Sequence, residues 1–124
     1  MVWQNIALTL AGVVGSAVAV FHGILMQRMM IRPIERALAG TPTSAGIRRL
    51  VSPLLHLSTI AWLAGGLALI AVGSGWAPPF RLPVALVVGA FYFHAMVLNC
   101  WATRGRHPGW MLMAAALLLI LIGA

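Results

Sequence analysis

Acidic residues are almost missing from this 124-residue sequence, which has a single glutamate, Glu35, no aspartate and no lysine. Charged residues make up only 7% of the chain, whereas a soluble domain carries about 25%. One cysteine, Cys100, excludes an internal disulfide bond and a cysteine-based zinc cluster. The motifs CxxCH and HExxH are also missing, so there is no signature of haem attachment or of a zinc hydrolase. These absences point away from a soluble domain and from two common kinds of metal chemistry.

Apolar residues, in contrast, make up 62% of the sequence, and its mean hydropathy is +1.02. They form four runs separated by segments that contain Pro, Gly and Arg. A helix of about 20 residues, rising 1.5 Å per residue, crosses the ~30 Å hydrocarbon core of a bilayer. The sequence therefore predicts an all-α, polytopic membrane protein, with a four-transmembrane-helix bundle in one domain, residues 1–124. The predicted spans are about 5–26, 50–74, 83–101 and 109–124.

The longest polar segment, residues 27–49, carries five of the eight arginines: Arg28, Arg32, Arg36, Arg48 and Arg49. Pro33 suits the first turn of a helix, and we expect the chain to bend near it. The residues after this bend should form a short amphipathic helix along the headgroup region, ended by the turn at 40–46. The arginines are predicted to bind anionic lipid headgroups or to dock another protein.

The arginines also predict an orientation. Seven of them lie in segments 27–49 and 102–108, and only Arg81 lies between the second and third spans. By the positive-inside rule, the two basic loops are cytoplasmic and both termini are periplasmic. The residues before the first span are uncharged, so we expect a retained span and not a cleaved signal peptide. The predicted location is the inner (cytoplasmic) membrane.

Small residues recur at helical spacing in the first two spans and predict close contacts between helices: Gly12, Gly15, Ser16, Ala19, Gly66 and Gly73. The fourth span is apolar on all sides, and we expect most of its surface to face lipid.

Three histidines lie inside predicted spans: His22, His56 and His94. Counted from the arginines, all three fall in the cytoplasmic half of the bilayer, His22 and His56 at nearly the same depth. Imidazole can ligate haem iron or a metal ion, so His22 with His56, and His94 in reserve, are candidate ligands of a b-type haem. The alternative is that these histidines hydrogen-bond to neighbouring helices. His107 is expected to be interfacial, without a ligand role.

The function favoured by the sequence is that of a small accessory or scaffold subunit without enzyme activity. It would dock to a larger membrane complex or to a second copy of itself. The alternative is a haem- or metal-binding electron carrier. A second alternative is a small transporter: the chain resembles four-helix proton-coupled exporters in length and number of spans. Those exporters have a glutamate in their first span, whereas Glu35 lies in the basic loop. Nucleic acid is not an expected partner, because the arginines flank apolar spans.

Overall fold

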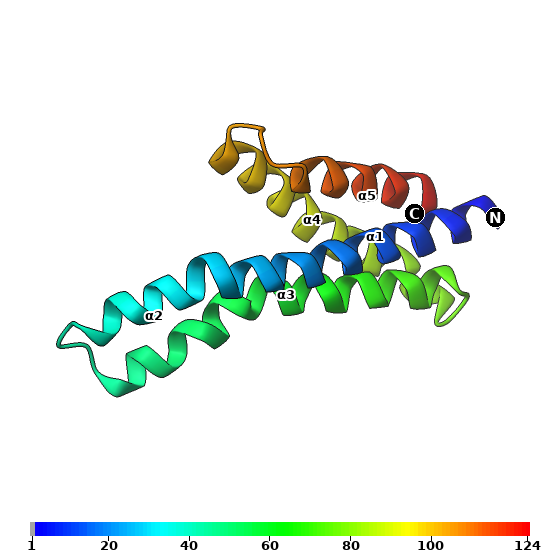
Figure 1. The fold of residues 1–124 in the computed structure, drawn as a ribbon. Coiled ribbons are helices and arrows are strands. Elements are labelled where there is room, and N and C mark those ends of the chain that lie inside the picture. The colour runs from blue at the N-terminus through cyan, green and yellow to red at the C-terminus, as the bar shows by residue number, and fades with distance from the viewer. Residues whose placement is uncertain (1) are drawn as a thin grey trace.

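The computed structural model describes residues 2–124, and within that range the chain is helical and has no strand (Figure 1). Short turns join the helices. In chain order the elements are α1 Val2–Met26, the π-helical turn η1 Gln27–Ile31, α2 Arg32–Ala39, α3 Ala45–Gly73, the 3-10 turn η2 Pro78–Phe80, α4 Arg81–Thr103 and α5 Gly109–Gly123. The prediction of an all-helical chain is confirmed.

The helix α1 does not end at the predicted bend. It continues through η1 into α2, so that residues 2–39 form one helical rod (Figure 1). Proline lacks an N–H and its ring displaces the carbonyl four residues earlier, here that of Met29. Met29 lies in η1, where the Arg32 N–H donates to the Gln27 carbonyl five residues earlier, so a wider turn takes the place of a kink. The expected bend near Pro33 is therefore wrong, because α2 continues the line of α1; the interfacial position of α2 stays a prediction.

Helices α1 and α3 run antiparallel, and glycines bring their backbones close together (Figure 1). A Cβ added at Gly66 would meet the Gly12 carbonyl oxygen at 2.8 Å and the Ser16 nitrogen at 2.9 Å. Nearer the N-terminus of α1, a Cβ at Gly73 would meet the Thr9 nitrogen at 2.8 Å. The two backbones are therefore in contact, and there is no room for a side chain at Gly66 or Gly73.

Helices α4 and α5 form a second hairpin that packs across α1 and α3. The core lies where this hairpin meets α1 and α3. Its central side chains are fully or almost fully buried: Leu8, Leu69, Tyr92, Met113 and Ala116. The Tyr92 hydroxyl donates to the Trp62 carbonyl oxygen at 3.3 Å, which links α4 to α3. One side of α5, with Met113, Ala116, Ile120 and Gly123 buried, contacts both α1 and α4.

Arg81 forms hydrogen bonds at the end of the α4–α5 hairpin that is farthest from its turn. Arg81, the first residue of α4, donates through Nε and Nη2 to the Gly123 carbonyl oxygen, at 2.9 and 2.6 Å, and through Nη1 to Asn5 Oδ1 at 2.6 Å. The last carbonyls of a helix have no partner within it. Arg81 therefore joins the start of α4, the end of α5 and the start of α1.

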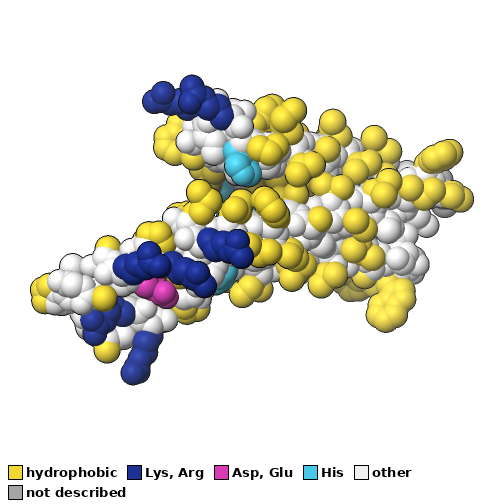
Figure 2. Space-filling view, in the orientation of Figure 1, with side chains coloured by type: hydrophobic (Ala, Val, Ile, Leu, Met, Phe, Trp, Pro, Cys, Tyr) yellow, Lys and Arg dark blue, Asp and Glu magenta, His cyan; other side chains and the backbone are white. Residues whose placement is uncertain are grey.

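Three helical segments are long and apolar enough to cross a membrane: Val2–Ala39, Ala45–Gly73 and Pro78–Thr103. The 15 residues of α5 reach only about 22 Å, less than the ~30 Å hydrocarbon core. Apolar side chains are spread over the visible surface, whereas the visible arginines gather at one end of the molecule, on two projections (Figure 2). The longer projection consists of residues 27–49, and we call it the basic arm.

Candidate functional site

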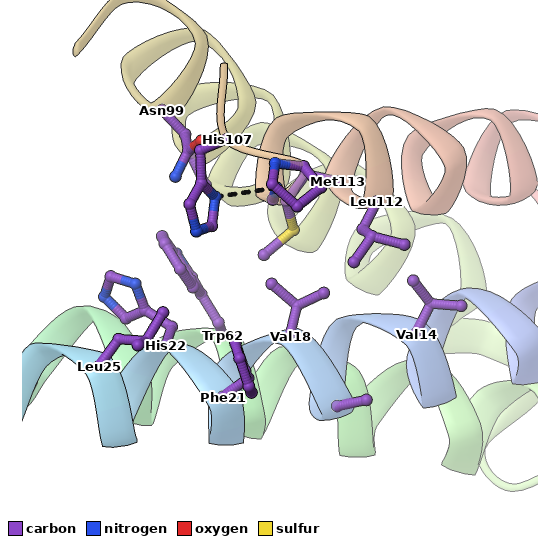
Figure 3. A pocket seen from close by; sticks show the side chains of 14 residues that line it. Val14, Val18, Phe21, His22, Leu25, Trp62, Asn99, His107, Leu112 and Met113 are labelled. Carbon is purple, nitrogen blue, oxygen red and sulfur yellow. Dashed lines mark hydrogen bonds between the residues drawn. The ribbon is translucent and has the colours of Figure 1, made fainter. Parts of the chain in front are cut away.

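A partly open cavity of about 460 Å³ lies between α1 and the α4–α5 hairpin. Most of its wall is apolar and comes from two elements that are far apart in sequence (Figure 3). Its apolar lining includes Val14, Val18, Phe21, Leu25, Leu112 and Met113. Four other side chains, which carry polar atoms, reach the cavity from three helices and a loop: His22, Trp62, Asn99 and His107. An apolar pocket with a few convergent polar groups is typical of a small-molecule site.

His107 lies in the turn between α4 and α5, and its ring points into the cavity (Figure 3). The backbone N–H of Gly109 donates to His107 Nδ1 at 3.0 Å. A ring nitrogen that accepts a hydrogen bond carries no proton, so in the neutral ring the proton is on Nε2. Within residues 2–124, no hydrogen bond engages Nε2. His107 thus offers the cavity an N–H donor.

The turn that carries His107 is fixed by further hydrogen bonds. Thr103 Oγ1 donates to the Asn99 carbonyl oxygen at 2.7 Å and accepts from the His107 backbone N–H at 3.4 Å. The indole N–H of Trp110 donates to the Gly105 carbonyl oxygen at 3.0 Å. These bonds set the position of the imidazole before any ligand arrives.

Asn99, in the last turns of α4, reaches the same part of the cavity (Figure 3). Its Oδ1 atom is buried and accepts no hydrogen bond from the described part of the chain. A buried polar atom without a partner costs about 1–3 kcal/mol, so this oxygen calls for a donor. Asn99 Oδ1 is enclosed by the protein, whereas His107 Nε2–H is a donor that lies at the cavity without a partner among residues 2–124.

His22 and Trp62 form the wall opposite this pair (Figure 3). Their ring centroids are 4.4 Å apart and the ring planes are inclined by 46°. His22 Nε2 also lies 3.4 Å from Ser58 Oγ on α3, which is long for a hydrogen bond. The two tilted rings give the cavity an aromatic wall.

The other candidate histidines lie elsewhere. His56 Nε2 is 2.9 Å from Gln27 Oε1; because an amide oxygen only accepts, His56 donates and its Nε2 carries the proton. His94 is exposed on the outer side of α4, and neither residue lines the cavity. In this conformation the Nε2 lone pair of His56 is not free, and haem ligation by His22 and His56 stays a prediction. Among residues 2–124, no group of three or more His, Cys, Asp or Glu is placed to hold a metal ion.

The arginines expected to bind lipid or a partner are all exposed on the basic arm: Arg28, Arg32, Arg36, Arg48 and Arg49. The small residues expected at helix contacts lie on α1 and α3. Among them Gly12, Gly15, Ala19, Gly66 and Gly73 are buried, and a Cβ at Gly15 would clash with the Tyr92 ring.

Sequence reasoning missed the part of the site formed by His107, Asn99 and Trp62. The sequence places Asn99 on the same face of its helix as Tyr92 and Met96, and in the structure Tyr92 on that face is buried in the core. This shared face was the available signal for Asn99. No signal of that kind exists for His107, because its position depends on how α5 packs against α1.

Comparisons with protein-family models, with curated proteins and with solved structures found no match to this chain.

Proposed function

We propose that this chain is an integral membrane protein that binds a lipid-soluble small molecule in the cavity between α1 and the α4–α5 hairpin. The observation that carries the proposal is an apolar cavity of about 460 Å³ lined by His107, whose Nε2–H has no hydrogen-bond partner among residues 2–124. The lining residues include no carboxylate, serine or cysteine, so the site offers groups for binding a molecule and few for transforming it.

The membrane setting of this proposal rests on surface chemistry. Long helices with apolar outer faces suit lipid better than water. The arginines of the basic arm and of the α4–α5 turn lie at one end (Figure 2), which favours a cytoplasmic position for that end in the inner membrane. In this orientation the cavity lies in the cytoplasmic half of the bilayer. For α5 to cross the membrane as a fourth span, the bilayer must be locally thin or residues of the adjoining turn must lie within the hydrocarbon core.

Topology can be tested by cysteine labelling in spheroplasts, with Cys100 replaced by serine. A cysteine at Thr43, in the tip of the basic arm, should not react with a membrane-impermeant maleimide until the membrane is permeabilised. A cysteine at Trp76, in the turn between α3 and α4, should react at once. Reaction of Thr43→Cys in intact spheroplasts would reverse the proposed orientation.

Ligand retention can be tested by filling the cavity. Val18→Trp should displace the bound molecule, because the indole would occupy the cavity that Val18 lines. The protein is purified in mild detergent and its organic extract is analysed by mass spectrometry. We expect a compound enriched over bulk lipid in the wild type and at least about tenfold depleted in the variant, a loss of ~1.4 kcal/mol.

The matched control is Val20→Trp, on the same helix at a position 52% exposed. It adds the same indole outside the cavity and should retain the compound. Equal retention by both variants, or no enriched compound in the wild type, would contradict the proposed function.

A second candidate, an accessory subunit that docks to a larger complex, is favoured by the basic arm. This helical hairpin extends away from the bundle with its five arginines exposed (Figures 1 and 2). Changing Arg32 and Arg36 to glutamate should release a partner that co-purifies in mild detergent and should leave the cavity compound in place. A wild-type protein that purifies alone under these conditions argues against docking.

A further inference from the structure

One end of the cavity adjoins the arginines of the molecule. In Figure 3, His22, Leu25 and His107 lie toward this end, and Val14 and Leu112 lie toward the other. The chain continues from Leu25 into the basic arm, and His107 belongs to the turn between α4 and α5. Both walls of this end therefore lead into segments that carry arginine, and we call the part lined by His22, Leu25 and His107 the basic end.

On one wall, a stripe of α1 residues leads to an arginine. The cavity is lined by Val14, Val18, Phe21 and Leu25, which follow each other at steps of four, three and four residues. Steps of three and four keep side chains on one face of a helix. A further step of three reaches Arg28, which is exposed. Arg28 thus lies just beyond the basic end, on the side of the helix that lines the cavity.

On the other wall, the α4–α5 turn carries Arg104 and Arg106, which are both exposed, and His107 directly follows Arg106. Figure 2 shows histidine side chains between the arginines of the two projections. The single acid of the chain, Glu35, lies farther out on the basic arm, in α2. The charge beside the basic end is therefore positive on both walls.

The chemistry of the basic end favours an anion. His107 Nε2–H and the arginine side chains are all donors, so the ligand group must accept hydrogen bonds. A hydroxyl accepts but brings no charge, and an ammonium group only donates and is repelled by the arginines. A carboxylate or a phosphate accepts from all of these donors, and charge-assisted hydrogen bonds are the strong ones. The attraction between the charges is also larger beside an apolar cavity than in water.

The rest of the cavity favours an alkyl chain. Away from the basic end its walls include Val14, Val18 and Leu112, and contact with them removes the apolar surface of a chain from water. The volume of about 460 Å³ is in the lower part of the range for small-molecule sites, which suits one chain better than two. A molecule with one anionic end and one apolar chain matches both parts of the cavity.

We propose that the cavity binds a single-chain anionic lipid, which is a carboxylate or a phosphate ester. Its headgroup accepts from His107 Nε2–H and lies between Arg28 and the arginines of the α4–α5 turn, and its chain follows the aliphatic walls. This inference rests on the proposed function, because it names the chemical class of the molecule bound in the same cavity.

The test compares five probes by calorimetric titration of the full-length protein in a mild non-ionic detergent, at a pH where the acids are ionised. The probes are dodecanoate, dodecyl phosphate, 1-dodecanol, dodecyltrimethylammonium and inorganic phosphate. We expect at least one of the two anionic lipids to bind about tenfold more tightly than each of the other three probes. The tighter of the two identifies the native headgroup as that of a fatty acid or of a phosphate ester.

Partition of the probes into detergent micelles is measured with Val18→Trp. In this variant the indole fills the cavity that Val18 lines, so the heat that remains reports the micelle alone. Only the binding that the wild type shows and Val18→Trp lacks is counted.

Neutral arginine variants test the headgroup site. Changing Arg28, Arg104 and Arg106 together to glutamine should weaken binding of the anionic lipid about tenfold, the sum of three exposed charge pairs. It should leave 1-dodecanol binding unchanged. All three side chains are exposed, so the fold should be retained, and circular dichroism checks this.

The matched control removes the same charge from the outer part of the basic arm, by changing Arg36, Arg48 and Arg49 to glutamine. These side chains are also exposed but do not adjoin the cavity lining. We expect a change in affinity of less than about threefold, because solvent screens charges at a distance.

His107→Phe separates the hydrogen bond from the charge. It should weaken binding of the anionic lipid and of 1-dodecanol by a similar factor, since the oxygen atoms of both accept from Nε2–H. The preference for the anionic lipid over the alcohol should remain.

The outcomes that overturn the inference differ from those that overturn the proposed function. The inference is contradicted if 1-dodecanol or the ammonium probe binds as tightly as the anionic lipids, or if the two triple variants lose the same affinity. If neither anionic lipid binds but Val18→Trp still loses an enriched native compound, the inference fails and the proposed function stands. If no probe binds and no compound is enriched in the wild type, both fail.

Discussion

Gly66→Ala should separate α1 from α3 and lower the free energy of unfolding by about 3 kcal/mol or more. The new methyl group would meet the Gly12 carbonyl oxygen at 2.8 Å and the Ser16 nitrogen at 2.9 Å. Both are backbone atoms of α1, so no side-chain rotation relieves the clash and the two helices must move apart. Because α1 also contacts α5 and lines the cavity, ligand binding should weaken as well.

The matched control is Gly89→Ala, in the apolar part of α4. A Cβ there would lie 3.8 Å from Ile120 Cγ2, an ordinary van der Waals contact. We expect no loss of stability, and a gain of up to about 1 kcal/mol from the better helix propensity of alanine. Thermal unfolding followed by circular dichroism in mild detergent measures both variants. Equal unfolding temperatures for the two would show that the α1–α3 contact tolerates a side chain.

Arg81→Leu should lower the free energy of unfolding by about 2–3 kcal/mol, within the range for hydrogen bonds made by a charged group. The bonds lost lie at the end of the bundle opposite the basic arm. The change removes three bonds, two to the Gly123 carbonyl oxygen and one to Asn5 Oδ1. The positive charge lost also faces the C-terminal end of α5, where the helix dipole is negative. The α5 end should then loosen from α1, and hydrogen exchange at Ile120–Gly123 should become faster.

Arg81→Lys distinguishes geometry from charge. Lysine keeps the charge but cannot present the planar fork that reaches two acceptors at once. We expect it to restore less than half of the lost stability. Full recovery by lysine would mean that charge alone holds this end together. Arg104→Leu, at an exposed arginine in the α4–α5 turn, should change stability by no more than about 0.5 kcal/mol.

The helices were predictable because long apolar runs and helix-ending residues mark them directly. The start of α5 at Gly109 coincides with the predicted bound, whereas the first helix continues beyond the predicted end at Met26 to Ala39. The start of α3 also differs from its predicted bound, because it begins at Ala45, five residues before the predicted Leu50. Ser44 caps this helix, because its hydroxyl oxygen accepts from the Ile47 N–H at 3.3 Å. A search for apolar runs begins after Arg48 and Arg49, so it leaves out the first turns of α3.

The site was less predictable, because it depends on pairings between helices. Depth counting places His22 and His56 at a common level, but depth does not say which way a side chain faces. In the structure His56 donates to Gln27, and His22 instead shares a cavity with His107, a residue 85 positions away in the numbering. That pairing requires α5 to lie against α1. A helix that is apolar on every side gives no indication of which side is buried, so this contact could not be read from the sequence.

The π-helical turn η1 also sets the rotational phase of the basic arm. A π turn holds one residue more than the α-helical turn it replaces, and one residue corresponds to about 100° around a helix axis. Each arginine of α2 therefore points roughly 100° away from the direction it would have on an uninterrupted α-helix of the same number of residues. A deletion of Met29 would preserve the composition of the arm and its distance from the bundle almost unchanged. The π turn would then close to an α turn, and the arginine face of α2 would keep nearly the same direction relative to the cavity. The angular register between these two surfaces therefore depends on the residue count and the π turn of η1 together.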